Sequence, residues 1–220
     1  PRKKALLLSV LAASALAVFN LSPARTALPS PNLASPKVAG KSVQTAVFAG
    51  GCFWGVEAVF EHVRGVSDVV SGYAGGNVET ANYDQVSSGH TGHAESVRIS
   101  YDPSRISYGQ LLKVFFAVAH DPTQLNRQGP DTGTQYRSAI FVVNEEQKRV
   151  AQAYIAQLQV ARAFPNSIVT QVAPLRAFHE AESYHQNYLV RHPDQPYIVF
   201  NDLPKLANLQ RQFPDLYVGK

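Results

Sequence analysis

Hydrophobic and polar positions along the chain follow two periods, and each change of period marks a helix or a strand. The run SVQTAVFAGG, residues 42–51, is apolar and ends in two glycines, which predicts a buried strand followed by a tight turn. Over residues 53–65 the apolar positions recur at helical spacing, which predicts a helix that stops at Gly65. Its recurring positions are Val56, Val59, Phe60 and Val63.

The rest of the chain is divided in the same way. Ser107 and Gln110 form the pattern of a capping box before a helix, and Asn144 is typical of the residue before a second helix. On the second helix we expect one face to be formed by Val150, Tyr154, Leu158 and Ala161. Further strands are expected at 68–76, 94–103, 137–143 and 167–174, a last helix at 180–193, and long polar loops at 75–93 and 123–136. The Pro-rich residues after 193 read as irregular.

This mixed order of strands and helices indicates the fold class. We expect one α+β domain over residues 42–220, a two-layer sandwich with helices packed on a mixed β-sheet. A chain of 220 residues is long enough for one substantial core.

The first residues have the pattern of an export signal. Basic residues precede the apolar run ALLLSVLAASALAVF, so residues 1–24 are expected to be a signal peptide, with an uncleaved membrane anchor as the alternative. Residues 25–41 are rich in Pro, Ala and Ser and are expected to be a flexible linker. The expected location is therefore the periplasm, a lumen or the extracellular space, or the cytoplasm if the N-terminus is misread.

Charge argues against a nucleic-acid partner. The chain has a formal net charge of +4, but residues 1–40 hold five basic and no acidic residues, and the remainder holds 15 basic against 16 acidic. The predicted domain is thus nearly neutral and has no basic stripe.

Cys52 is the only cysteine of the chain, and it follows two glycines at the expected start of a helix. A single thiol cannot form an internal disulfide, so it is either inert and buried or chemically used. The free N–H groups and the dipole of a helix start lower the pKa of a thiol there, which favours the reactive alternative. Phe53 and Trp54 follow, either as the wall of an apolar pocket or as core residues.

Five motifs, in this order, resemble a known family. They are GCFWGVE, GYAGG, NYDQVSSGHTGHAESVRISYDP, HDPTQLNRQGPDTGTQYRSAIF and AESYHQNYL. Together they closely resemble the peptide-methionine (S)-S-oxide reductases, the A-type methionine sulfoxide reductases, over residues 43–213. The resemblance implies an α+β sandwich with its nucleophilic cysteine at a helix N-terminus. It also implies reduction of the S epimer of methionine sulfoxide, free or in proteins, as repair after oxidative stress.

The resemblance also implies a role for each matching residue. Cys52 would attack the sulfoxide sulfur and become a sulfenic acid, and Glu95 would protonate the sulfoxide oxygen. The other matching residues would bind substrate: Tyr83 and Tyr136 at the oxygen, Asp131 at a water or the substrate, and Phe53 and Trp54 around the S-methyl group. Taken singly, Glu95 is better explained as a solvated strand-edge residue and Asp131 as a turn former, and the two tyrosines can equally be loop or strand aromatics.

The chain departs from the family in one respect that concerns its reductant. Many family members carry further cysteines near the C-terminus, whereas this chain ends NLQRQFPDLYVGK without one. The sulfenic acid would therefore be reduced by an external thiol, from thioredoxin, glutaredoxin or glutathione. We expect no bound cofactor, no nucleic-acid partner and a monomer.

Three other interpretations stay open at this point. A metal site could use His90, His93 and Glu95, or His179 and His185, but the spacing matches no common metal motif, so no metal is expected. A Cys-His hydrolase would need a histidine beside Cys52 and no reductant. A non-enzymatic redox sensor would need only the thiol.

Overall fold

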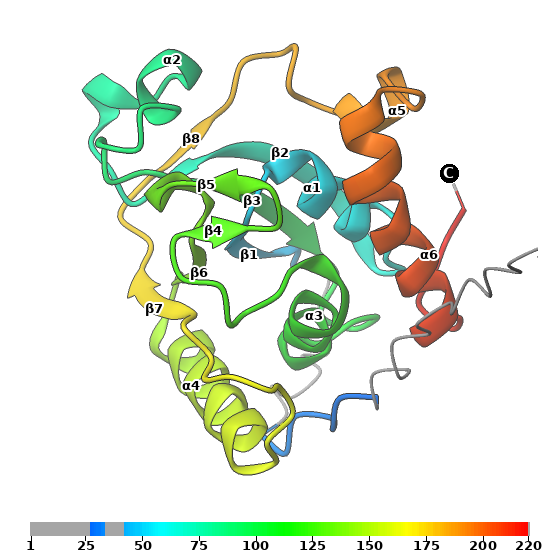
Figure 1. The fold of residues 1–220 in the computed structure, drawn as a ribbon. Coiled ribbons are helices and arrows are strands. Elements are labelled where there is room, and N and C mark those ends of the chain that lie inside the picture. Colours follow the sequence, from blue (N-terminus) through cyan, green and yellow to red (C-terminus); the bar gives the residue numbers. More distant parts are fainter. Residues whose placement is uncertain (1–26, 34–41, 220) are drawn as a thin grey trace, which may run out of the picture.

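The computed structural model describes residues 27–33 and 42–219. Within these residues, six strands form one sheet in the order β7-β6-β1-β3-β2-β8 (Figure 1). The β6–β7 pair is parallel and the other neighbouring pairs are antiparallel. The predicted α+β architecture with a mixed sheet is therefore confirmed.

The strands keep most of the expected positions. The sheet consists of β1 Gln44–Gly50, β2 Val66–Ala74, β3 Ala94–Tyr101, β6 Ser138–Val142, β7 Gln171–Pro174 and β8 Phe178–Glu180. The second long polar loop contains a small antiparallel pair, β4 Arg127–Gln128 and β5 Asp131–Thr132.

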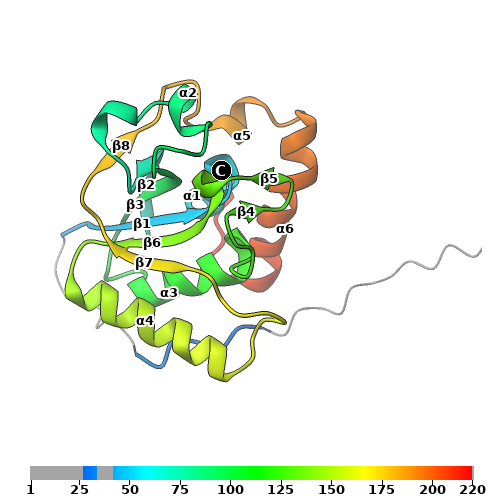
Figure 2. The same ribbon diagram turned by 60° about the vertical axis from the view of Figure 1, so that its left-hand side comes forward.

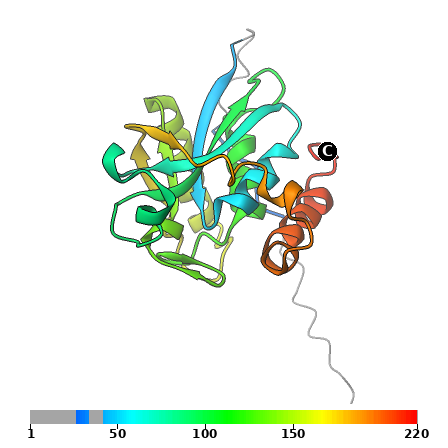
Figure 3. The same ribbon diagram turned by 90° about the horizontal axis from the view of Figure 1, so that it is seen from above.

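The helical segments are short except for α4. They are α1 Phe53–Glu61, η1 Val78–Thr80, α2 Tyr83–Val86, α3 Tyr108–Val114, η2 Phe115–Ala119, η3 Thr134–Tyr136, α4 Glu145–Val160, α5 Tyr188–Arg191, η4 Ile198–Asp202 and α6 Leu203–Gln212. Figure 2 shows α3 and α4 lying along one side of the sheet, next to β6 and β7. In Figure 3 the C-terminal helices lie together beside α1.

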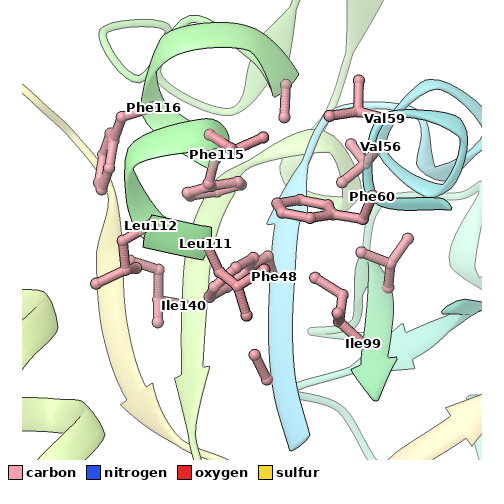
Figure 4. Packing of buried hydrophobic residues seen from close by; sticks show 14 of the residues in the cluster. Phe48, Val56, Val59, Phe60, Ile99, Leu111, Leu112, Phe115, Phe116 and Ile140 are labelled. Atoms are coloured by element: carbon pink, nitrogen blue, oxygen red, sulfur yellow. The ribbon is translucent and has the colours of Figure 1, made fainter. Parts of the chain in front are cut away.

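The main core lies between the sheet and these helices. Phe48 of β1 stacks on Phe115, with ring centroids 4.8 Å apart, and is tilted against Phe60 of α1 at 5.6 Å (Figure 4). Val47, the preceding residue, points to the opposite face of β1 and joins a smaller apolar cluster there. Both faces of β1 are therefore covered, which explains why its sequence is a continuous apolar run rather than an alternating one.

Two expectations for the last forty residues are wrong. The helix expected at 180–193 exists only as α5, because Asn187 adopts a left-handed backbone with φ of 52° and the segment before it is held by tertiary contacts. The C-terminal stretch expected to be irregular is instead η4 and α6, with Pro204 at the start of α6, where a proline needs no N–H partner.

The segment that precedes β1 includes a docked part. Leu28 is buried in the main core, and the Tyr154 hydroxyl donates to the Pro29 carbonyl at 2.9 Å. The Gln157 side chain donates to the Ser30 carbonyl and accepts from the Asn32 N–H. Residues 27–33 thus lie against α3 and α4 (Figure 1), whereas the rest of the expected linker and the expected signal peptide fall outside the described residues. Of the helices described, none has the length and apolar character needed to cross a membrane.

Candidate active site

Cys52 lies where β1 turns into α1. Gly51 has φ of 93°, a conformation that L side chains rarely adopt, and a Cβ there would approach the Gln128 side chain to 2.5 Å. The glycine turn places Cys52 at the residue before the first turn of α1, with no side-chain cap on the helix. Its side chain is 8% exposed and unpaired, as a single cysteine must be.

Glu95 comes from β3 and reaches the same helix start. It is 2% exposed, and its Oε2 accepts a hydrogen bond of 3.0 Å from the Phe53 backbone N–H. Burial raises the pKa of Glu95 to about 8; the Phe53 N–H opposes this rise and the nearby charge of Asp131 adds to it. Glu95 is therefore mostly protonated at neutral pH, the state that a general acid needs.

The thiol pKa does not shift in the expected direction. Burial raises the pKa of Cys52 well above its usual range, and the charges of Glu95 and Asp202 raise it further. The Trp54 backbone N–H and Lys205 lower the pKa, but by less. The expectation of a lowered pKa is wrong because it considered only the helix start and neither the burial nor the neighbouring carboxylates.

All seven residues that the sequence singled out line one cavity of about 190 Å³. They reach it from separate elements: α1, α2, β3, β5 and η3. The lining residues are Cys52, Phe53, Trp54, Tyr83, Glu95, Asp131, Tyr136 and Tyr197. No histidine belongs to this lining. The cavity therefore combines one thiol, two carboxyls, three phenols and two apolar rings.

The tyrosine hydroxyls of the cavity wall stay protonated at neutral pH. Burial raises the pKa of Tyr83 and of Tyr136, and the charge of Glu95 raises both further. Burial also raises the pKa of Asp131, although the hydrogen bond that this carboxylate accepts from the Tyr197 hydroxyl opposes the rise. The phenols are thus hydrogen-bond donors available to an oxygen atom in the cavity.

Tyr197 is the lining residue that sequence reasoning missed. It lies at the residue before η4, in the stretch expected to be irregular. A helical pattern was present there, because apolar residues recur three or four positions apart at Leu206, Leu209 and Phe213.

The histidines considered as metal ligands form no group of three or more possible ligands within the described residues, although the His93 and His179 rings lie edge to face with centroids 5.6 Å apart. The His93 ring accepts from the Gly76 N–H and contacts the Asn77 carbonyl at 2.9 Å. His179 lies in β8, and His185 bonds the Trp54 indole at 3.1 Å. A second hollow, of about 310 Å³, lies at the end of α4, and its lining residues include no thiol, carboxyl or imidazole. Of these two hollows, only the one at Cys52 is lined by a thiol and carboxyl groups.

Comparison with known proteins finds one family over most of the chain. The peptide methionine sulfoxide reductase family matches residues 44–216. The peptide methionine sulfoxide reductase MsrA 2 of Mesorhizobium japonicum is 60% identical over 177 residues, covering 80% of this chain and 91% of that protein. Its counterpart in Synechocystis sp., also named MsrA 2, is 53% identical over 205 residues, covering 92% and 96%.

Solved structures show the same fold. Mxr1 of Saccharomyces cerevisiae in its reduced form has a TM-score of 0.65 and 34% identity, covering 69% of this chain and 87% of that one. Methionine sulfoxide reductase A of Corynebacterium diphtheriae has a TM-score of 0.61 and 34% identity, covering 70% and 77%.

Proposed function

The chain belongs to the peptide methionine sulfoxide reductase family and reduces methionine sulfoxide with thiols, and from this premise we propose that Cys52 is its nucleophile and Glu95 its acid. One observation carries this proposal. The Glu95 carboxyl accepts a hydrogen bond from the N–H of Phe53, the residue that follows Cys52, so acid and thiol lie at the same helix start and both line the cavity.

The reaction begins when the Cys52 sulfur attacks the sulfoxide sulfur. Glu95 gives its proton to the sulfoxide oxygen, because this oxygen is a poor leaving group while it is charged. The oxygen ends on Cys52, and the thiol proton replaces the proton lost by Glu95. The products are the thioether of methionine and a Cys52 sulfenic acid: two electrons pass from the cysteine sulfur to the substrate sulfur.

The raised pKa of Cys52 fits this exchange. A carboxylate at Glu95 opposes a thiolate nearby, whereas a protonated Glu95 does not. The two groups therefore titrate as a coupled pair, and a thiolate at Cys52 is less unfavourable while Glu95 holds its proton.

We propose that the walls of the cavity select the S epimer. Phe53 and Trp54 offer an apolar surface for the S-methyl group, and Tyr83 and Tyr136 offer O–H donors to the oxygen. The sulfoxide sulfur carries methyl, oxygen and the side-chain carbon around one stereocentre. Of the two epimers, we propose that the S form presents methyl and oxygen to their matching walls while its sulfur faces Cys52.

A second thiol must complete the cycle, and Cys52 is the only cysteine. An external thiol displaces water from the sulfenic acid and forms a mixed disulfide with Cys52. A further thiol then releases Cys52 as a free thiol and leaves the reductant as a disulfide. Thioredoxin, glutaredoxin and glutathione supply this chemistry, and oxidised proteins and free methionine sulfoxide are the substrates that we propose.

We also propose that the protein is exported and acts as a monomer. The support for export is the basic and apolar pattern of residues 1–24, and the near-neutral charge of the remaining chain is in keeping with a freely diffusing domain. N-terminal sequencing of the mature protein from cell fractions, with light scattering of the purified protein, tests both parts.

The deciding experiment follows each separated epimer of a methionine sulfoxide blocked at both ends, with dithiothreitol as reductant. We expect consumption of the S epimer alone and none with Cys52→Ser. Consumption of both epimers would contradict the wall assignment. Turnover by Cys52→Ser would contradict the nucleophile, and turnover without any thiol would point to a hydrolase.

A further inference from the structure

The segment Glu182–Tyr188 lies outside the cavity but contacts two of its walls. Glu182 accepts from the Tyr83 N–H at 2.9 Å. His185 accepts from the Trp54 indole N–H at 3.1 Å. Tyr188 stacks on the Trp54 indole, with centroids 3.7 Å apart and planes 5° from parallel. A single stretch of chain therefore supports both the apolar wall and the phenol wall.

We propose that His185 is a positioning residue that sets the place of Trp54 in the methyl-binding wall through its hydrogen bond to the indole. The proposal rests on the proposed role of Trp54 as part of that wall. His185 does not line the cavity, so it acts through the side chains that it contacts.

The surroundings of His185 favour this role. The side chain is 2% exposed, and its ring centroid lies 4.5 Å from that of Tyr83 and 5.0 Å from that of Phe53. Both of these rings line the cavity with Trp54. A displacement of the imidazole would therefore change the packing of three wall residues at once.

The hydrogen bond determines the tautomer of His185. An indole N–H only donates, so the Nδ1 atom that receives it carries no proton, and the neutral ring holds its proton on Nε2. Burial lowers the pKa of His185, which keeps the ring neutral at physiological pH. Nε2 is buried and has no hydrogen-bond partner among the described residues.

This unpartnered nitrogen argues against a role in packing alone. A buried N–H without an acceptor is unfavourable, and a phenyl ring would fill the same space without that cost. What the imidazole has and a phenyl ring lacks is the Nδ1 acceptor for Trp54. The preference for histidine at this position is therefore explained by the indole bond.

Two other contacts limit the motion of Trp54. Tyr188 covers one face of the indole, and the Asn187 N–H that precedes it donates to Glu57 Oε2 at 3.0 Å. Tyr197 meets the indole edge-on, at 5.9 Å and 86°. These contacts restrict tilting of the ring, but only the bond to His185 fixes where the indole nitrogen points.

The test uses the fact that Trp54 is the only tryptophan of the chain, so one indole N–H signal in a ¹⁵N–¹H NMR spectrum reports on it. Three variants separate the contributions of the Nδ1 acceptor, the Nε2 position and the ring itself. His185→Asn places an amide oxygen near the position of Nδ1 and keeps the acceptor. His185→Gln places its amide near the position of Nε2, and His185→Phe keeps only a ring.

We expect the indole signal to move in His185→Phe and His185→Gln and to return towards its original position in His185→Asn. Turnover of the blocked S epimer should show KM raised roughly 3- to 10-fold in the first two variants, the effect of one net hydrogen bond. The kcat should change by less than about twofold, since the bond is equally present in the ground and transition states, and His185→Asn should recover most of the KM.

Other results would overturn the proposal. The first is an unchanged KM in a His185→Phe variant that folds. The second is a rise of KM in His185→Asn as large as in His185→Phe, although the indole signal of His185→Asn keeps its original position. If the variants do not fold, hydrogen exchange of the indole N–H in the unchanged protein decides: exchange as fast as in a free tryptophan rules out the bond. Failure of the proposed function is seen separately, because it would abolish turnover by the unchanged protein and leave the NMR result intact.

Discussion

Helix α1 and helix α3 begin in contrasting ways. The first turn of α3 is completed locally: the Ser107 side chain accepts from the Gln110 N–H, and the Gln110 side chain accepts from the Ser107 N–H. The first turn of α1 has no such cap at Cys52, and the Phe53 N–H is bonded to Glu95 from a strand. A cap from neighbouring residues makes a helix start stable by itself, whereas a cap from another element couples the helix start to the tertiary structure.

The same contrast extends to charge. Helix α4 has Glu145 and Glu146 in its first turn. Both are exposed, so their charges interact favourably with the positive end of the helix dipole at little cost in desolvation. Helix α1 has no acidic residue in its first turn, and the carboxyl that serves it is buried and mostly protonated. The starts of α3 and α4 are thus stabilised by exposed or local groups, whereas the start of α1 depends on the buried carboxyl that we propose as the acid.

The substitution Glu95→Gln separates the two functions of the α1 cap and has the largest expected effect. Its amide oxygen can still accept from the Phe53 N–H, but the side chain can no longer donate an acidic proton. We expect kcat for the S epimer to fall by roughly two to four powers of ten, the usual contribution of a general acid, with the helix retained. Single-turnover kinetics measure the rate of the chemical step, and circular dichroism measures the helix content. Near-normal turnover would contradict the role of Glu95.

The pH profile tests the same carboxyl without a substitution. Because we propose that Glu95 acts in its protonated form, kcat/KM should fall about tenfold per pH unit above the pKa of about 8 that this carboxyl has in the substrate-free protein. The folded state also binds this proton more tightly than the unfolded state, with its ordinary pKa of 4.5, so the resulting stability is complete below 4.5 and is lost as pH rises to about 8. Urea unfolding should show a smaller loss of stability over this pH range in Glu95→Gln than in the unchanged protein, because Glu57, whose pKa burial raises to about 7, contributes equally to both. The same dependence of unfolding free energy on pH in the two proteins would exclude the raised pKa of Glu95.

Gly55→Ala and Gly109→Ala compare the first turns of α1 and α3 directly. A Cβ at Gly55 would lie 2.0 Å from Asp202 Oδ1 and 2.6 Å from Lys205 Nζ, so a buried ion pair would have to move. We expect a loss of about 1–3 kcal/mol in the free energy of unfolding, typical of overpacking. At Gly109 a Cβ would lie 3.3 Å from the Pro31 side chain, which is a tight contact. The higher helix preference of alanine should offset this contact, so the free energy of unfolding should stay nearly unchanged. Equal losses in urea unfolding would show that the two turns do not differ.

Ser107→Ala has the smallest expected effect on activity. It removes the local cap of α3 and should cost about 1 kcal/mol of stability, while kcat and KM stay as they are. Asn144→Ala at α4 is the matched variant, because Asn144 accepts from the Gln147 N–H in the same way. A fall in kcat with either would mean that helix starts distant from Cys52 also control the site.

Local features of the sequence predicted the parts of the fold that local contacts determine. The glycine turn before Cys52, the capping box at Ser107 and the alternation over Val97, Ile99 and Tyr101 all correspond to observed elements. Ala161 was expected on the buried face of the α4 helix, but it is the exposed residue after the helix end.

Features that depend on distant contacts could not be derived in this way. Glu182 and Gln186 lie in a stretch with helical composition, yet their side chains bond Tyr83 and Ser71 on other elements, and the backbone follows those contacts. The cavity is assembled from loops far apart in sequence, so only the family resemblance grouped its residues beforehand. The net shift of the Cys52 pKa depends on burial, which no motif displays.

The docked residues 27–33 have a consequence for where the folding unit begins. The family match starts at residue 44, but Leu28 fills a place in the core, 6% exposed, and Pro29 supplies the acceptor for Tyr154. A truncation to residue 42 would keep all the cavity residues, but would leave a void beside α4 and a buried hydroxyl without its partner. Transplanting this catalytic domain into another protein therefore requires a graft that starts no later than Leu28, about 16 residues before the start of β1 at Gln44.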